Sequence, residues 1–194
     1  VEQADSLAWN PHKWMGTILD TALFYVRDVA HLEAVMSTNP SYLRSGADGQ
    51  VTQYRDWGIP LGRRFRALKL WFHLRLDGIE AIRSRLRRDL DNARWFRDQV
   101  AAAEGWEVVA PVPLQTVCIR HVPVDGRGQP LSGELLDTHT LAWVGRINES
   151  GTAFMTPSQL DGRWMARVSI GVEGTTREHV ARLWELIQQS VAAG

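Results

Sequence analysis

The chain has 194 residues, of which 44% are hydrophobic and 23% charged, as is typical of a folded domain and not of a disordered segment. It carries 22 basic and 22 acidic residues, so its formal net charge is zero. That balance argues against a general nucleic-acid or membrane-surface binder. No apolar run approaches the roughly 18 residues of a membrane span, so a soluble protein is expected.

The start of the chain predicts two strands joined by a turn. ADSLAW and TALFYVRD read as strands, and NPHKWMG between them contains turn residues. A short helix is expected over 29–36. The segment STNPSYLRSGADGQ, at 37–50, is rich in Ser, Asn, Pro and Gly, a composition typical of a mobile loop that acts as a lid.

The rest of the chain predicts alternating helices and strands. Apolar residues recur at helical spacing over 65–76 and 79–90, with a break at Asp77-Gly78, and the second helix is expected to reach Ala103. Two strands follow, then a helix over 131–150, a hairpin turning at Asp161-Gly162 and a terminal helix. The order from residue 78 onward predicts a self-contained α+β domain, 78–194, after a first segment, 1–77.

Several kinds of site are not supported by the sequence. Its six histidines and one cysteine are too scattered for a metal centre, His121 and His139 being the nearest approach to one. No glycine-rich phosphate loop appears. The basic residues between 63 and 88 are interleaved with acids and are interpreted as a solvated or interface surface, so no nucleic-acid partner is expected.

The single cysteine, Cys118, lies in the apolar run TVCIRHV, which predicts a buried strand. One cysteine cannot form an internal disulfide, so a reducing, cytoplasmic location is expected. The chain begins without an initiator methionine and reaches a strand-like pattern at once. We therefore expect it to be a fragment of a longer protein.

Lys13, in WNPHKW, is the main candidate for chemistry. An amine attacks carbonyl groups when desolvation or a nearby cation lowers its pKa, and Trp9, Trp14 and His12 offer both possibilities. By spacing alone, an ordinary solvated turn lysine is the favoured interpretation.

The combination of ADSLAWNPHKWMG with YLRSGADGQVTQYRDWGIPLGRRF and LDGRWMARVSIGVEGTTREHVARLWELI resembles the group II pyridoxal-phosphate-dependent amino-acid decarboxylases, within them the aromatic-L-amino-acid decarboxylase branch. The resemblance covers nearly the whole chain. It implies the C-terminal part of a fold-type I enzyme: the end of the large α/β domain (1–77, with a mobile loop at about 37–50) plus the small C-terminal α+β domain (78–194). A homodimer is also implied.

The resemblance further implies roles for individual residues. Lys13 would hold pyridoxal 5'-phosphate as an internal aldimine, and Asn10 and His12 would contact its phosphate. Tyr42 matches the tyrosine of the family's mobile loop, which would return a proton to the substrate Cα after CO₂ leaves. By the same resemblance, relatives that form aldehydes have phenylalanine in place of this tyrosine. Arg55, Arg63, Arg64 and Arg167 receive no assigned role.

The expected function is thus decarboxylation of an aromatic L-amino acid to its amine. The upstream aspartate, ring-stacking residue and phosphate loop of the family are expected outside this chain, so the fragment alone is predicted to be inactive. Two alternatives remain: a decarboxylase of glutamate or another amino acid from the same group, and a non-catalytic chain that retains only a small domain and a dimerisation surface.

Overall fold

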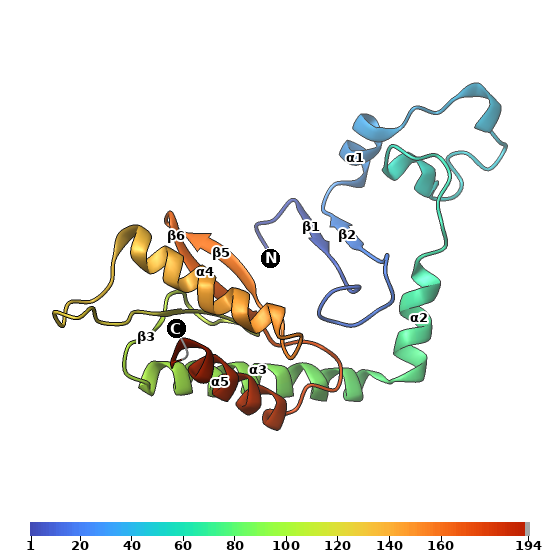
Figure 1. The fold of residues 1–194 in the computed structure, drawn as a ribbon. Coiled ribbons are helices and arrows are strands. Elements are labelled where there is room, and N and C mark those ends of the chain that lie inside the picture. The colour runs from blue at the N-terminus through green and yellow to red at the C-terminus, as the bar shows by residue number, and fades with distance from the viewer. Residues whose placement is uncertain (193–194) are drawn as a thin grey trace. The chain divides into compact units, whose positions relative to one another are not determined.

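The computed structural model describes residues 1–192. The chain forms two compact units, Val1–Ile79 and a second that begins at Glu80 (Figure 1). The mixture of helices and sheets expected from the sequence is confirmed. The domain boundary expected after residue 77 concerns a longer protein and stays a prediction.

The first unit begins with an antiparallel strand pair in which Ser6 lies opposite Val26 and Trp9 opposite Leu23. The two short 3-10 helices, η1 and η2, were not predicted from the sequence, because three or four residues are too few to establish a periodicity. The elements are β1 (Ser6–Trp9), β2 (Leu23–Val26), α1 (Val29–Met36), η1 (Ser41–Leu43), η2 (Tyr54–Trp57) and α2 (Ala67–Leu76).

Large apolar side chains of the first unit are exposed. No residue of α2 is buried, although its sequence has helical apolar spacing, and Leu76 is 80% exposed. Buried residues within 1–79 are confined to the connection between β1 and β2, namely Pro11, Thr17 and Thr21. The connection that carries Lys13 is therefore the most buried part of this unit. The first unit does not cover the apolar side chains of α2.

The second unit has the element order expected from the sequence, and the break between α2 and the next helix falls at Gly78, whose φ is +78°. Its four strands form an antiparallel sheet in the order β3-β4-β6-β5, with a hairpin turning at Asp161-Gly162. The elements are α3 (Ile79–Ala102), β3 (Trp106–Val108), β4 (Thr116–His121), α4 (Gly133–Glu149), β5 (Thr156–Leu160), β6 (Arg163–Ser169) and α5 (Arg177–Ala192).

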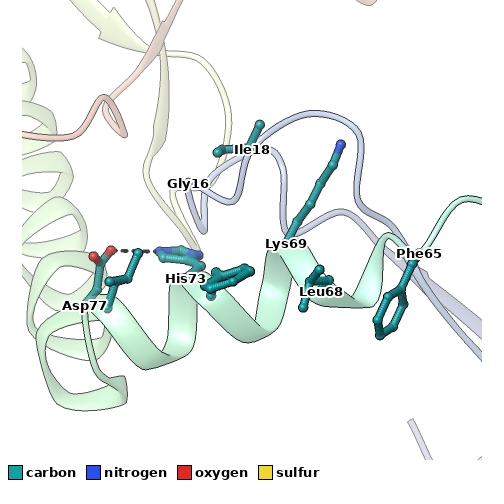
Figure 2. Close-up of a pocket in the computed structure, with 9 residues that line it drawn as sticks. Gly16, Ile18, Phe65, Leu68, Lys69, His73 and Asp77 are labelled. Atoms are coloured by element: carbon teal, nitrogen blue, oxygen red, sulfur yellow. Dashed lines mark ion pairs between the residues drawn. The ribbon is translucent and has the colours of Figure 1, made fainter.

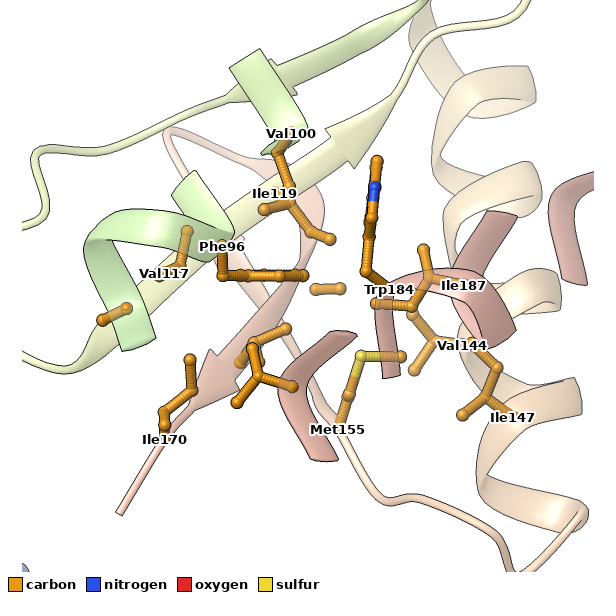
Figure 3. Close-up of a cluster of buried hydrophobic side chains, with 14 of the residues drawn as sticks. Phe96, Val100, Val117, Ile119, Val144, Ile147, Met155, Ile170, Trp184 and Ile187 are labelled. Carbon is orange, nitrogen blue, oxygen red and sulfur yellow. The ribbon is translucent and has the colours of Figure 1, made fainter. Parts of the chain in front are cut away.

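The hydrophobic core lies between one face of this sheet and the three helices of the unit. Val117 of β4 is opposite Val168 of β6, and both side chains are buried. Figure 3 shows how Phe96 of α3 and Trp184 of α5 meet in this core; their ring centroids are 5.8 Å apart in an edge-to-face arrangement. The second unit thus contains a packed core of its own.

Cys118 corrects one expectation. It is in a strand, as predicted, but it is only half-buried, because it alternates with the buried Val117 and Ile119 and so points to the opposite face of the sheet. Its partner on that face is Arg167. Burial raises the pKa of the Cys118 thiol, and the charge of Arg167 partly offsets this increase.

Across residues 1–192, none of the helices combines the length and the apolar character that crossing a membrane requires.

His121 and His139, 18 residues apart, contact each other directly. Nδ1 of His121 lies 2.9 Å from Nε2 of His139, and the ring of Trp106 lies 4.7 Å from that of His121, centroid to centroid. Burial, together with a smaller effect of the neighbouring His139, lowers the pKa of His121 to about 4. Burial also lowers the pKa of His139, with a contribution from the charge of Arg146. The pair is therefore neutral in the folded chain at neutral pH.

We expect the stability of the second unit to fall as pH decreases from about 6.5 to about 4. In this window the unfolded chain binds protons that the folded His121 does not, so acid favours unfolding. The urea midpoint should be lower at pH 5 than at pH 7, and His121→Gln should reduce this difference. His179→Gln, which alters an exposed histidine, is the matched control. Equal pH dependence in His121→Gln and wild type would contradict the expectation.

Candidate functional site

Lys13 lies in a tight turn between β1 and β2. The amide of Lys13 donates to Asn10 O (3.1 Å), and the amide of Gly16 donates to Lys13 O (3.0 Å). Gly16 has φ +84°, a conformation that other residues rarely adopt. The amide of Thr17 then donates to Pro11 O at 3.0 Å and closes the turn. The backbone of Lys13 is thus fixed on both sides.

The side chain of Lys13 is exposed, and Trp9 is itself 46% exposed. Within residues 1–192, therefore, the flanking tryptophans do not bury the Lys13 side chain, because β1 ends at Trp9 and the turn carries Lys13 out into solvent. The backbone of Lys13 is thus fixed, and its side chain is accessible.

The chain has two lysines, Lys13 and Lys69, and they differ in their contacts. Lys69 Nζ donates to Leu19 O at 2.9 Å and to the Asp20 carboxylate at 3.3 Å. Within residues 1–192, no hydrogen bond or ion pair engages the amine of Lys13. Of the two lysine amines in the described part of the chain, that of Lys69 is thus engaged by Leu19 and Asp20 and that of Lys13 is not.

His12 is held by the backbone at the far end of the same connection. Its Nδ1 lies 2.6 Å from Thr21 O, to which it donates, and 3.1 Å from Thr21 N. This contact orients the ring and leaves Nε2 free to meet a ligand. Asn10 is partly buried at the start of the turn. Asn10, His12 and Lys13 thus share one short turn, which their adjacency in the sequence had already implied.

A cluster of charges joins this connection to the start of α2. The Asp20 carboxylate accepts from Arg66 Nε at 2.9 Å, and Lys69 approaches it from the next turn of the chain. The hydrogen bond from Arg66 is the main reason why the pKa of Asp20 is lowered to about 2. These contacts were not predicted from the sequence, because Asp20 is 46 residues from Arg66 and 49 residues from Lys69.

Tyr42 belongs to η1 and is 75% exposed. In the part of the chain that the structure describes, no hydrogen bond or ring contact joins it to Lys13, Asn10 or His12. The segment 37–50 is anchored close to its ends: Ser37 Oγ donates to Asp56 at 2.8 Å, and Arg55 pairs with Asp48 at 3.0 Å. The expected role of Tyr42 and the expected mobility of the segment remain predictions.

The arginines left without a role have distinct positions. Arg55 holds Asp48, as described above, and Arg63 donates to Tyr54 O at 2.9 Å, so both organise the segment before α2. Arg64 is exposed. Arg167 lies on β6 of the second unit, opposite Cys118.

Comparison with known proteins shows the family to which the chain belongs. The family model described as "Pyridoxal-dependent decarboxylase conserved domain" matches residues 1–122, which include the Lys13 turn, Tyr42 and both described anchors of the 37–50 segment. The chain belongs to the pyridoxal-dependent decarboxylase family.

Particular relatives cover nearly all of the chain. A phenylacetaldehyde synthase of Arabidopsis thaliana is 39% identical over 99% of this chain and 39% of its own length. A tryptophan decarboxylase of Camptotheca acuminata is 35% identical over 97% of this chain and 37% of its own length. The crystal structure of Oryza sativa TDC with PLP and tryptamine superposes with a TM-score of 0.90 at 33% identity, over 99% of this chain and 39% of that one. The chain thus spans about two-fifths of the length of these relatives.

Proposed function

We propose that this chain is part of a longer enzyme that decarboxylates an aromatic L-amino acid to its amine and CO₂. The observation that carries the proposal is the Lys13 turn, which presents a free amine from a fixed backbone in a member of the decarboxylase family. The portion is proposed to be the C-terminal part of that enzyme, as the sequence resemblance implies.

The residues of the turn fit pyridoxal phosphate. Lys13 offers a primary amine for the cofactor's aldehyde, and the Asn10 amide offers hydrogen-bond donors of the kind that phosphate oxygens accept. With Nδ1 of His12 donating to Thr21 O, Nε2 donates to a phosphate oxygen only when the ring is protonated, and the pair is then charge-assisted. Pyridoxal phosphate, when bound, supplies an electron sink for the bond that is broken at the substrate. We propose that Lys13 holds it covalently and that Asn10 and His12 orient its phosphate.

The protein's contribution to the reaction is orientation and proton transfer. The fixed turn keeps the Lys13 amine in one place, which removes much of the entropic cost of positioning it. Tyr42, on an exposed segment, is proposed to come to the substrate and donate its phenol proton to Cα, while the segment excludes water. Its exposure in the described chain is consistent with a group that acts only when the segment closes.

The aromatic branch is supported by the relatives, which are named for tryptophan, tyrosine and phenylacetaldehyde chemistry. Glutamate or another amino acid of the same group remains the alternative substrate. A second activity, aldehyde formation, is favoured by the resemblance to the phenylacetaldehyde synthase. The tyrosine at position 42 favours the amine instead, because phenylalanine at this loop position characterises the aldehyde-forming relatives by the sequence resemblance.

A homodimer and a cytoplasmic location complete the proposal. The exposed apolar residues of β1, β2 and α2 form a surface that more protein would cover, either the rest of the chain or a second copy. The location rests on the single cysteine. In the remaining alternative, a non-catalytic dimerisation fragment, the Lys13 amine would bind no cofactor.

The decisive experiment supplies the full-length protein with pyridoxal phosphate and, separately, dopa, tyrosine, tryptophan, phenylalanine and glutamate, and measures amine and CO₂. We expect amine from at least one aromatic substrate and none from glutamate. The 194-residue chain in the same assay should give at least about a thousandfold less product, since it spans about two-fifths of its relatives. Absence of any amine from the full-length protein would refute the proposed function.

A further inference from the structure

A line of three polar side chains connects α2 to the turn of Lys13. Thr17 Oγ1 lies 2.8 Å from His73 Nδ1, and His73 Nε2 lies 3.0 Å from the Asp77 carboxylate. His73 and Asp77 are four residues apart and so share one side of the helix end. Figure 2 shows the contact between His73 and Asp77 beside the loop that carries Gly16 and Ile18, at the edge of a cavity of about 540 Å³.

The directions of these hydrogen bonds follow from the groups involved. A carboxylate only accepts, so His73 Nε2 carries a hydrogen and donates it to Asp77. In the neutral ring Nδ1 is then an acceptor, and the Thr17 hydroxyl donates to it. Asp77 thereby fixes which nitrogen faces Thr17, in the way that a carboxylate behind a histidine sets the tautomer at many sites.

Burial makes this arrangement costly to break. Thr17 is 3% exposed and the His73 side chain 11%. A buried polar group that loses its partner keeps the full cost of desolvation. Asp77 is more open, with 45% of its side chain exposed, so water can partly replace it.

Thr17 transmits the contact to Lys13. Its amide closes the turn onto Pro11 O, and the preceding Gly16 amide holds Lys13 O. Because Thr17 is tied to α2 by its side chain and to the turn by its backbone, a shift of Thr17 moves the backbone on which Lys13 is carried. The ion pair between Asp20 and Arg66, at the start of α2, holds the connection between β1 and β2 at a second point.

We infer that Thr17, His73 and Asp77 are positioning residues that set the orientation of the Lys13 turn for cofactor binding. The inference rests on the proposed function, since it concerns the affinity of Lys13 for pyridoxal phosphate. None of the three residues needs to touch cofactor or substrate for this role.

The test titrates the full-length protein with pyridoxal phosphate, follows the visible absorption of the bound cofactor and records thermal stability in parallel. Thr17→Val and His73→Phe should each weaken cofactor binding about fivefold, the effect of about one hydrogen bond. Asp77→Leu should weaken it less, and Asp77→Asn should restore it, because the amide oxygen still accepts from Nε2. Thr140→Val is the matched control: it removes a buried threonine hydroxyl, bonded to Leu136 O, from the second unit.

The outcomes separate the inference from the proposed function. If wild type binds no cofactor, the proposed function fails. If wild type binds it while Thr17→Val and His73→Phe bind equally well, the inference alone is overturned. The same follows if both variants and Thr140→Val lose affinity and stability in parallel, or if Asp77→Asn behaves like Asp77→Leu. Weaker binding in Thr17→Val and His73→Phe, with Thr140→Val unchanged and Asp77→Asn near wild type, supports it.

Discussion

Replacing Lys13 by alanine in the full-length protein is expected to abolish covalent attachment of pyridoxal phosphate and to reduce decarboxylation by about a thousandfold or more. Removal of a nucleophile on which covalent catalysis depends has effects of at least this order. The variant should lack the visible absorption band that the cofactor gives when it is linked to a lysine. Borohydride reduction followed by mass spectrometry should find no labelled peptide.

The two-lysine composition of the chain provides a matched control. Lys69→Arg keeps a cation beside Asp20 and should retain both the band and the label on Lys13. The exposed position of Lys13 in its turn predicts that Lys13→Ala folds as well as wild type, so a loss of the band cannot be ascribed to unfolding. A labelled cofactor peptide from Lys13→Ala would show that the attachment site lies elsewhere in the full-length protein.

Replacing Tyr42 by phenylalanine is expected to shift the product from amine toward aldehyde. The substitution keeps the ring and removes only the phenol, which is the proposed proton donor to Cα. General acid catalysis contributes about 10²- to 10⁴-fold, so the rate of amine formation should fall by at least about a hundredfold. Chromatography of products from one aromatic substrate, with amine and aldehyde measured together, distinguishes slower turnover from a changed outcome.

Tyr54→Phe is the appropriate control for this experiment. Tyr54 is also exposed and precedes α2; its ring packs edge-to-face on Trp57 at 5.3 Å, a contact that phenylalanine retains. We expect its amine yield to equal that of wild type. Unchanged amine yield and rate in Tyr42→Phe would contradict the assigned role. The comparison is informative because the chain as a whole resembles a phenylacetaldehyde synthase, whereas Tyr42 favours the amine. The experiment therefore tests whether this one residue decides the product.

Elements of the fold were predicted well where their signals are local. The break at Gly78 and the hairpin at Asp161-Gly162 are set by a few adjacent residues, and both are found in the structure. The 3-10 helices were missed because they are short. The half-buried position of Cys118 was missed because an apolar run does not say which of its alternating side chains faces the helices.

The site divides in the same way. Adjacency in the sequence alone placed Asn10, His12 and Lys13 in one turn, and the family resemblance supplied their proposed chemistry. The exposure of the Lys13 amine depended on where β1 ends and on how the tryptophans pack, so it required the structure. Tyr42 was found only through the resemblance, because an exposed aromatic in a loop has no pattern that marks it as a proton donor.

The sequence by itself determined the family and the order of the α-helices and strands, because these depend on local patterns and contiguous motifs. The family resemblance marked Lys13 as the lysine proposed to hold the cofactor. Only the tertiary structure decided what holds that lysine in place. Thr17 and His73 are 56 residues apart, and Asp20 and Arg66 are 46 apart, so no periodicity links them. They meet because α2 packs beside the connection between β1 and β2, and contacts of this kind exist only once the chain has folded.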